Sequence, residues 1–222
     1  MDAIIPAAGL ATRMRGLPKF LLPCDLEYLT LIERHLANLQ SICETVWIPT
    51  RPEMVGLLDQ LGLSRDNVVI IPIRSENMTQ TISRVMSVSS AQKFQLVMPD
   101  TYFHGQMPYD LELENDELVT LACWKIRPEQ RGKLGQVQIV NESKVVDMRD
   151  KDPICDYEYS WGSLIFRKEL HKYMDLSEPH VGYAVKNALV SGANIGAKKI
   201  DGKYFDCGTP SEYISLLSEV LS

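Results

Sequence analysis

The sequence predicts a single α/β domain built on a central, mostly parallel sheet flanked by helices. Short apolar runs rich in β-branched residues alternate along the chain with longer segments in which apolar residues recur at helical spacing. This alternation is typical of parallel strands joined by crossover helices. The chain has 222 residues, 45% of them hydrophobic, and contains neither an internal repeat nor a linker rich in Pro, Gly or Ser. One continuous domain with a sizeable core is therefore expected.

The first half of the chain contains most of the expected elements. Ile4 and Ile5 end a buried strand, because Pro6 has no backbone N–H with which to continue the ladder. A helix is expected over residues 30–42, with an apolar stripe formed by Leu31, Ile32, His35, Leu36 and Leu39. Further strands are expected over residues 45–48, 68–71 and 95–98, and further helices over residues 53–61 and 79–88.

In the second half, a strand is expected to follow Gly135 and another to span residues 144–148. Thr209, Pro210 and Glu212 predict the start of a C-terminal helix. Threonine and glutamate have the spacing of a capping box, and proline favours the first helical position. The apolar stripe of this helix is expected to consist of Ile214, Leu217 and Leu221.

Composition narrows the possible partners and compartment. A net charge of -6 argues against a nucleic-acid-binding surface, so any phosphate site must be a local pocket. No apolar run approaches the ~20 residues of a membrane span, and a secretory signal is not indicated, so we expect a cytoplasmic protein with no membrane partner. The 5 cysteines are scattered and never form a C-x-x-C pair. They indicate neither a disulfide framework nor a zinc site, and most are expected to be small core residues.

The loop that follows the first strand has the composition of a phosphate-binding loop. Ala7, Ala8 and Gly9 carry almost no side chain, so a ligand could approach the backbone N–H groups, and Gly9 is free to take positive φ. Arg13 offers a planar set of donors and Lys19 a compact mobile charge for phosphate oxygens. The alternative is an ordinary surface loop with two solvated cations.

Two aspartates lie at the ends of predicted elements, one just after a strand and one just before a helix. Asp100 directly follows the apolar strand expected over residues 95–98, and in open α/β sheets ligands bind beyond the carboxyl ends of the strands. A carboxylate there could bind Mg²⁺, although an Asx-type turn that caps Tyr102 or Phe103 is the more common local role. Asp206 lies just before the C-terminal helix and could be a second metal ligand or a local backbone cap.

These motifs resemble those of the sugar-phosphate nucleotidylyltransferases, also called nucleotide-sugar pyrophosphorylases. The run from Ala7 to Met14 is similar to the family pattern A-A/G-G-x-x-T/S-R-M/L, and residues 18–23 match P-K-x-L-x-P. Residues 206–210 resemble the D-x-G-T/N-P element near the end of the family domain. The resemblance implies a Rossmann-like, single-domain fold of the nucleotide-diphospho-sugar transferase type over residues 1–222. About residues 1–110 would bind the nucleotide, and about residues 111–222 would form the acceptor-binding part and the C-terminal helix.

The resemblance also implies roles for the nucleotide side of the site. Mg²⁺ would be bound by Asp100 and Asp206, Arg13 would hold the leaving pyrophosphate, and Lys19 would stabilise the α-phosphoryl group. The nucleobase would meet the first loop, with Ala7, Ala8 and Gly9, and the segment after the third strand, with Thr79 and Gln80. Thr79 could equally cap a helix.

On the acceptor side, the resemblance points to Gly135 and to the family element E-K-P, which reads D-K-D-P from Asp150. Asp150 would contact sugar hydroxyls, with the shorter acid and the inserted Asp152 as departures from the family, and Lys151 would bind the acceptor phosphate. Trp161 and Gly162 resemble a later strand that lines the sugar pocket, where Trp161 could stack on a sugar face or simply belong to the core.

The implied reaction joins a nucleoside triphosphate to a sugar 1-phosphate and releases pyrophosphate. One alternative is a cytidylyltransferase that acts on a polyol phosphate or phosphocholine. Another is a non-catalytic regulatory protein that binds nucleotide sugars. A glycosyltransferase ranks last, because residues 100–102 do not form the D-x-D motif expected of that class. A monomer and a homodimer both remain open, and Glu158, His104 and His180 are left out of the mechanism as solvated loop residues.

Overall fold

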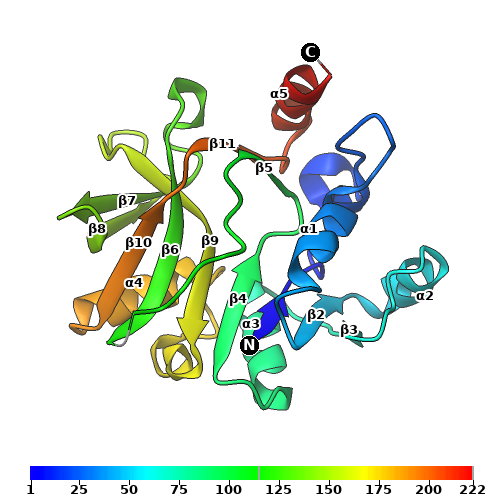
Figure 1. Ribbon diagram of the computed structural model, residues 1–222, viewed down its shortest axis with the longest axis horizontal. Coiled ribbons are helices and arrows are strands. Elements are labelled where there is room, and N and C mark those ends of the chain that lie inside the picture. Colours follow the sequence, from blue (N-terminus) through cyan, green and yellow to red (C-terminus); the bar gives the residue numbers. More distant parts are fainter. Residues whose placement is uncertain (115, 222) are drawn as a thin grey trace.

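A nine-stranded mixed sheet runs through the part of the chain that the structure describes, in the order β3-β2-β1-β4-β9-β6-β10-β8-β7 (Figure 1). The structure is a computed structural model that describes residues 1–114 and 116–221. The strands of this sheet are β1 (Asp2–Ile4), β2 (Thr45–Thr50), β3 (Val68–Pro72), β4 (Lys93–Val97), β6 (Glu117–Lys125), β7 (Gly135–Val140), β8 (Lys144–Asp150), β9 (Tyr159–Arg167) and β10 (Asn194–Lys199). A separate two-stranded sheet pairs β5 (Thr101–Gly105) with β11 (Gly202–Asp206).

The first half of the sheet is parallel, as predicted. β1 pairs in parallel with β2 and with β4, and β2 pairs in parallel with β3. The connections contain the three helices expected from apolar spacing, which are α1 (Leu31–Leu39), α2 (Pro52–Gln60) and α3 (Met78–Val88). The largest difference is in α1, which ends at Leu39, three residues before the predicted end at residue 42, and begins one residue later than predicted.

The second half of the sheet is mainly antiparallel, so the description as mostly parallel fits the first half alone. β9 runs antiparallel to β4 and β6, and β8 runs antiparallel to β7 and β10, while β6 and β10 are parallel. The physical reason is the length of the connections. β7 and β8 are joined by a short turn in which Asn141 and Glu142 have positive φ, which leaves no room for a crossover helix.

Helices cover both faces of the sheet. Along β1 the side chains alternate between two cores, because successive residues of a strand point to opposite faces. Ala3 packs in the core that contains α1 and α2, whereas Ile4 packs in the core that contains α3 and α4 (Gly182–Val190). All five residues expected on the stripe of α1 are buried. Four cysteines are also buried, as expected, namely Cys24, Cys43, Cys123 and Cys207.

The C-terminal helix α5 (Pro210–Val220), drawn in red in Figure 1, begins where the sequence predicts. It packs through a different face from the one predicted. Ile214 and Leu221 are exposed, and Leu216 is the buried residue, with Tyr213 beside it. The Tyr213 hydroxyl donates to the carbonyl oxygen of Pro23 at 2.8 Å, and this contact fixes the rotation of the helix. The predicted stripe was therefore wrong, since apolar residues occur on more than one side of this helix.

Short 3-10 helices lie in the connections between these elements. They are η1 (Thr12–Met14), η2 (Lys19–Leu21), η3 (Pro128–Gln130) and η4 (Lys168–Tyr173). In the part of the chain that the structure describes, none of the helices has both the length and the apolar character needed to cross a bilayer.

Candidate active site

Asp100 and Asp206 lie together at the carboxyl end of β4. Asp100 occupies the short connection between β4 and β5, and Asp206 is the last residue of β11. Because β5 and β11 are antiparallel, with Asp206 opposite Thr101, the two acids reach the same edge of the molecule. The backbone N–H of Cys207 donates to the carbonyl oxygen of Asp100 at 2.8 Å and holds the two segments together. Two carboxylates that are far apart in sequence thus become neighbours.

The electrostatics of this pair indicate a site that would favour a cation. Burial and the nearby negative charge of Asp100 raise the pKa of Asp206 to about 6, against the opposing effects of the Gly208 N–H, Lys19 and Arg13. Lys19 Nζ lies 3.0 Å from Asp100 Oδ2, with only 13% of the lysine side chain exposed. The Gly208 N–H donates to Asp206 Oδ1 at 3.0 Å. Two converging carboxylates therefore share one partly buried lysine.

The donor set fits a magnesium ion that is shared with phosphate. Among the residues that the structure describes, no group of three or more His, Cys, Asp or Glu side chains could hold a metal. A site with only two protein carboxylates does not fit a structural zinc ion. It does fit Mg²⁺, which usually takes one or two carboxylates and completes its shell with water and substrate phosphates. Asp100 and Asp206 are the residues that could hold it.

The loop after β1 offers unused backbone donors. Across the described ranges, the N–H groups of Ala8, Gly9 and Leu10 donate to no protein acceptor. Unpaired N–H groups in a small-residue loop form an anion-binding surface. The N–H of Ala7 is not available, because it donates to the carbonyl oxygen of Pro49 at 2.9 Å and extends the sheet. The prediction that a ligand meets the N–H of Ala7 therefore does not hold, and Ala7 instead fixes the base of the loop.

The backbone turn in this loop also differs from the prediction. Positive φ occurs at Ala11 and Arg15, which flank η1, and at Gly16, but not at Gly9. A Cβ placed on Gly9 would meet nothing within 4 Å. Glycine at this position therefore leaves the backbone open to an approaching group and does not serve a left-handed turn. Arg13, in η1, lines a pocket of about 400 Å³ that also includes Asp206 and Lys151; we call it the Arg13 pocket.

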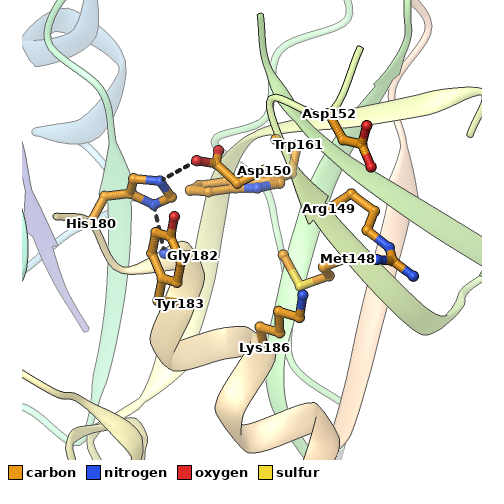
Figure 2. Close-up of a pocket in the computed structure, with 10 residues that line it drawn as sticks. Met148, Arg149, Asp150, Asp152, Trp161, His180, Gly182, Tyr183 and Lys186 are labelled. Carbon is orange, nitrogen blue, oxygen red and sulfur yellow. Dashed lines mark hydrogen bonds and ion pairs between the residues drawn. The ribbon is translucent and has the colours of Figure 1, made fainter. Parts of the chain in front are cut away.

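The five residues assigned to the acceptor side line one space. A central pocket of about 140 Å³ connects this space to Asp206, and its predicted members are Gly135, Asp150, Lys151, Trp161 and Gly162. The central pocket shares residues with the Arg13 pocket and with a larger pocket of about 440 Å³, which we call the Lys186 pocket (Figure 2). Through these shared residues the three pockets adjoin one another, and Asp206 lines two of them.

Glycine is required at two positions to shape this space. A Cβ on Gly135 would lie 2.4 Å from Trp161 Nε1, and a Cβ on Gly162 would lie 2.3 Å from the ring of Tyr204. Gly135 is also paired with Asp150 across β7 and β8. Trp161 is only partly buried, so its ring belongs to the pocket wall and not simply to the core.

Lys151 adopts a conformation that non-glycine residues rarely take. Its φ is 51°, and its N–H donates to the carbonyl oxygen of Leu134 at 3.1 Å. Left-handed backbone at a non-glycine residue costs about 1 kcal/mol or more and is often found at functional sites. This geometry directs the chain so that Lys151 lines both the central pocket and the Arg13 pocket.

Thr79 and Gln80, which are predicted to meet the nucleobase, line none of these three pockets. Thr79 is buried in α3, and Gln80 braces the preceding loop, since it accepts from the Glu76 N–H at 3.1 Å and donates to the Leu176 carbonyl at 3.2 Å. The cap of α3 is Asn77, not Thr79.

Sequence reasoning missed His180, Lys133 and Lys186 as pocket residues. His180 Nε2 lies 3.3 Å from Asp150 Oδ2, as the dashed line in Figure 2 shows. His180 reaches the pocket because the Met78 N–H donates to the carbonyl oxygen of Pro179 at 3.1 Å, which ties this segment to α3. An isolated histidine ahead of a helix gave no signal in the sequence.

Taken with the sheet order, paired carboxylates, a partly buried lysine and an open small-residue loop define a nucleotidyltransferase with the nucleotide-diphospho-sugar transferase fold. Residues 3–122 match the MobA-like NTP transferase domain, and the chain belongs to this family. A comparison with curated proteins found no sequence match.

Solved structures share the fold over nearly the whole chain. A candidate glucose-1-phosphate thymidylyltransferase from Bacillus anthracis, solved with sucrose, is 17% identical with a TM-score of 0.84, over 99% of this chain and 95% of its own. A UDP-glucose pyrophosphorylase complexed with UDP-glucose is 18% identical with a TM-score of 0.80, and the match covers 98% of this chain and 97% of that protein. The inositol-1-phosphate CTP transferase from T. maritima is 16% identical with a TM-score of 0.78, and the match covers 99% of this chain and 95% of that protein.

Proposed function

We propose that this protein is a Mg²⁺-dependent nucleotidylyltransferase that joins a nucleoside triphosphate to a sugar 1-phosphate and releases pyrophosphate. The observation that carries the proposal is the position of the Lys19, Asp100 and Asp206 cluster. It lies between a loop with unused N–H donors and a pocket large enough for a phosphorylated sugar. The reaction fits a cytoplasmic enzyme, since nucleoside triphosphates are abundant there.

In this proposal, the first half of the chain binds the nucleotide and the second half binds the acceptor. About residues 1–110 bind the nucleotide, with the N–H groups of Ala8 and Gly9 on the phosphates. About residues 111–222 supply the acceptor pocket and α5. Lys151 binds the acceptor phosphate, Asp150 contacts acceptor hydroxyls, and Trp161 stacks on an apolar face of the acceptor.

The chemistry is a displacement at the α-phosphorus. An oxygen of the acceptor phosphate forms the new bond, and the bond to the leaving pyrophosphate breaks. The attacking phosphate is already ionised near neutral pH, so no general base is needed. Arg13 binds the leaving pyrophosphate, and Lys19 stabilises the charge that develops on the α-phosphoryl oxygens.

Mg²⁺ fits the site through Asp100 and Asp206. When bound, it would neutralise negative charge on the phosphates. Burial is the main cause of the raised pKa of Asp206, and repulsion between the two carboxylates adds to it, so a bound cation would relieve the site of excess negative charge.

A phosphorylated polyol is the second candidate acceptor. One of the similar structures is described as an inositol-1-phosphate CTP transferase, and the Lys186 pocket, with about 440 Å³, has room for a ring beyond the central pocket. A cytidylyltransferase acting on such a compound would use the same phosphate chemistry.

The test is pyrophosphate release with Mg²⁺ across a matrix of five nucleoside triphosphates and four acceptors. The acceptors are glucose 1-phosphate, inositol 1-phosphate, glycerol 3-phosphate and phosphocholine. Asp100→Asn is expected to abolish release, whereas Asp66→Asn, at an exposed aspartate, should leave it unchanged. Nucleotide binding without release in any combination would contradict the proposal and favour a regulatory protein.

A further inference from the structure

His180, which has no part in the proposed phosphate chemistry, contacts Asp150 in the acceptor pocket. Asp150 ends β8, and His180 lies in the segment just before α4, so two distant parts of the chain meet here. His180 Nε2 is 3.3 Å from Asp150 Oδ2. Only 19% of the histidine side chain and 27% of the aspartate side chain are exposed, so solvent screens this contact only partly.

A second hydrogen bond fixes the tautomer of the ring. The backbone N–H of Gly182 donates to His180 Nδ1 at 3.2 Å, so this nitrogen must keep its lone pair. The proton of the neutral imidazole is therefore on Nε2, where it donates to Asp150 (Figure 2). The ring is held from both sides and can orient the carboxylate.

Asp150, whose carboxylate contacts His180, lines the space assigned to the acceptor. Asp150 lines both the central pocket and the Lys186 pocket, and it pairs across the sheet with Gly135, on which Trp161 rests. The hydrogen bond from His180 is the main cause of the lowered pKa of Asp150; burial opposes it, and the charge of Lys151 and a hydrogen bond from Tyr183 act in the same direction as His180. Asp150 is thus an ionised hydrogen-bond acceptor.

We infer that His180 is a positioning residue that holds Asp150 through Oδ2, so that Oδ1 accepts a hydrogen bond from a hydroxyl group of the phosphorylated acceptor. This inference rests on the proposed function. It also narrows the acceptor to a compound with hydroxyl groups, such as a sugar phosphate or a polyol phosphate.

The surrounding charge favours a hydroxyl over a cationic group. The two pockets that Asp150 lines contain the cations Lys133, Arg149, Lys151 and Lys186, which outnumber the carboxylates of Asp150, Asp152 and Asp206. These cations offset the carboxylate charge, so the space has little attraction for a quaternary ammonium group despite the nearby aromatic ring.

The test compares two substitutions of one residue. His180→Ala removes the donor to Asp150, whereas His180→Gln retains an N–H donor that can reach it. With the best pair of substrates, His180→Ala should raise the acceptor KM about tenfold, the value of one charge-assisted hydrogen bond, and leave kcat and the nucleotide KM within about twofold. His180→Gln should recover most of the loss. His171→Ala is the matched control, because His171 is exposed on η4 and lines none of the three pockets.

A double-mutant cycle asks whether His180 acts through Asp150. In an Asp150→Asn background, the loss caused by His180→Ala should be much smaller than in the wild type. Thermal unfolding of each variant checks that the fold persists. Full additivity in the cycle would overturn the positioning role.

The remaining outcomes separate this inference from the proposed function. Normal turnover by the wild type with an unchanged acceptor KM in His180→Ala overturns the inference alone. Turnover with phosphocholine and no hydroxyl-bearing acceptor also overturns it. If the wild type turns over no pair of substrates, the proposed function fails. In that case, calorimetric binding of glucose 1-phosphate and inositol 1-phosphate tests the role of His180. The inference is overturned if the wild type and His180→Ala bind these compounds with equal affinity, or if neither binds them.

Discussion

Lys19 is the side chain on which the proposed phosphate chemistry depends most. It contacts Asp100 at 3.0 Å and is mostly shielded from solvent, so its charge acts at full strength beside the reacting groups. Lys19→Met should reduce kcat at least about a hundredfold, the effect of losing one preorganised electrostatic contact. Steady-state pyrophosphate release measures this change.

The matched control for Lys19 is Lys93→Met, which removes an exposed lysine at the start of β4. Its kcat should stay within about twofold of the wild type, as for surface substitutions in general. Both variants should keep the far-ultraviolet circular dichroism of the wild type. A Lys19→Met enzyme with undiminished kcat would remove Lys19 from the mechanism.

A methyl group added at Gly135 should disturb the packing of the pocket wall. In Gly135→Ala, the new Cβ would lie 2.4 Å from Trp161 Nε1, so the indole ring must move out of the pocket wall. We expect the free energy of unfolding to fall by about 1–3 kcal/mol through overpacking and the acceptor KM to rise. Urea denaturation and steady-state kinetics measure the two effects.

Gly56→Ala is the contrasting substitution. Gly56 lies within α2, and a Cβ there would meet nothing within 4 Å. Alanine should raise the free energy of unfolding by about 0.5–1 kcal/mol, because glycine is costly inside a helix. If Gly135→Ala proved as stable as Gly56→Ala, the tight seat of Trp161 on Gly135 would be refuted.

At the scale of elements, α1 has the best defined start in the chain. The Thr30 side chain accepts from the Glu33 N–H, and the Glu33 carboxylate accepts from the Thr30 N–H at 2.9 Å, which completes a capping box. Thr30→Ala should lower the free energy of unfolding by about 1 kcal/mol, whereas Thr30→Ser, which keeps the hydroxyl, should lose much less. Urea denaturation of the two variants tests this, and equal losses would mean that the cap contributes nothing.

Elements with local signals could be predicted, and elements defined by distant partners could not. The start of α1 and the strands β2 and β3 follow from caps and apolar spacing within a few residues. The antiparallel order of the second half depends on which distant strands pair, and no local pattern specifies this. The rotation of α5 likewise depends on the contact between Tyr213 and Pro23, which are 190 residues apart.

At the scale of the whole molecule, the same distinction applies to the candidate site. Local strand and helix signals located Asp100 and Asp206 one by one, and the family resemblance alone implied that the two side chains meet. Their proximity is created by the pairing of β5 with β11, which the sequence did not predict. His180 escaped notice because its contact with Asp150 depends on how α4 packs against the sheet.

His35 couples α1 to β5 and to the segment that follows β5, and it makes the whole fold sensitive to acid. It is fully buried, its Nδ1 lies 2.8 Å from the Tyr109 hydroxyl, and its ring packs against Phe103. Burial is the main cause that lowers its pKa from 6.5 to about 3. Below pH 6.5 the unfolded chain therefore binds a proton at this histidine that the folded protein does not bind, down to about pH 3.

The free energy of unfolding should consequently fall as the pH drops through this window. Between pH 7 and pH 5 the contribution of His35 amounts to about 2 kcal/mol, since each pH unit below the unfolded pKa is worth about 1.4 kcal/mol. His35→Asn cannot titrate, so its urea denaturation should show a pH dependence flatter by about this amount. His171→Asn, at an exposed histidine, should keep the slope of the wild type. An equal slope in His35→Asn and the wild type would show that His35 does not determine acid sensitivity, and that other buried groups dominate it.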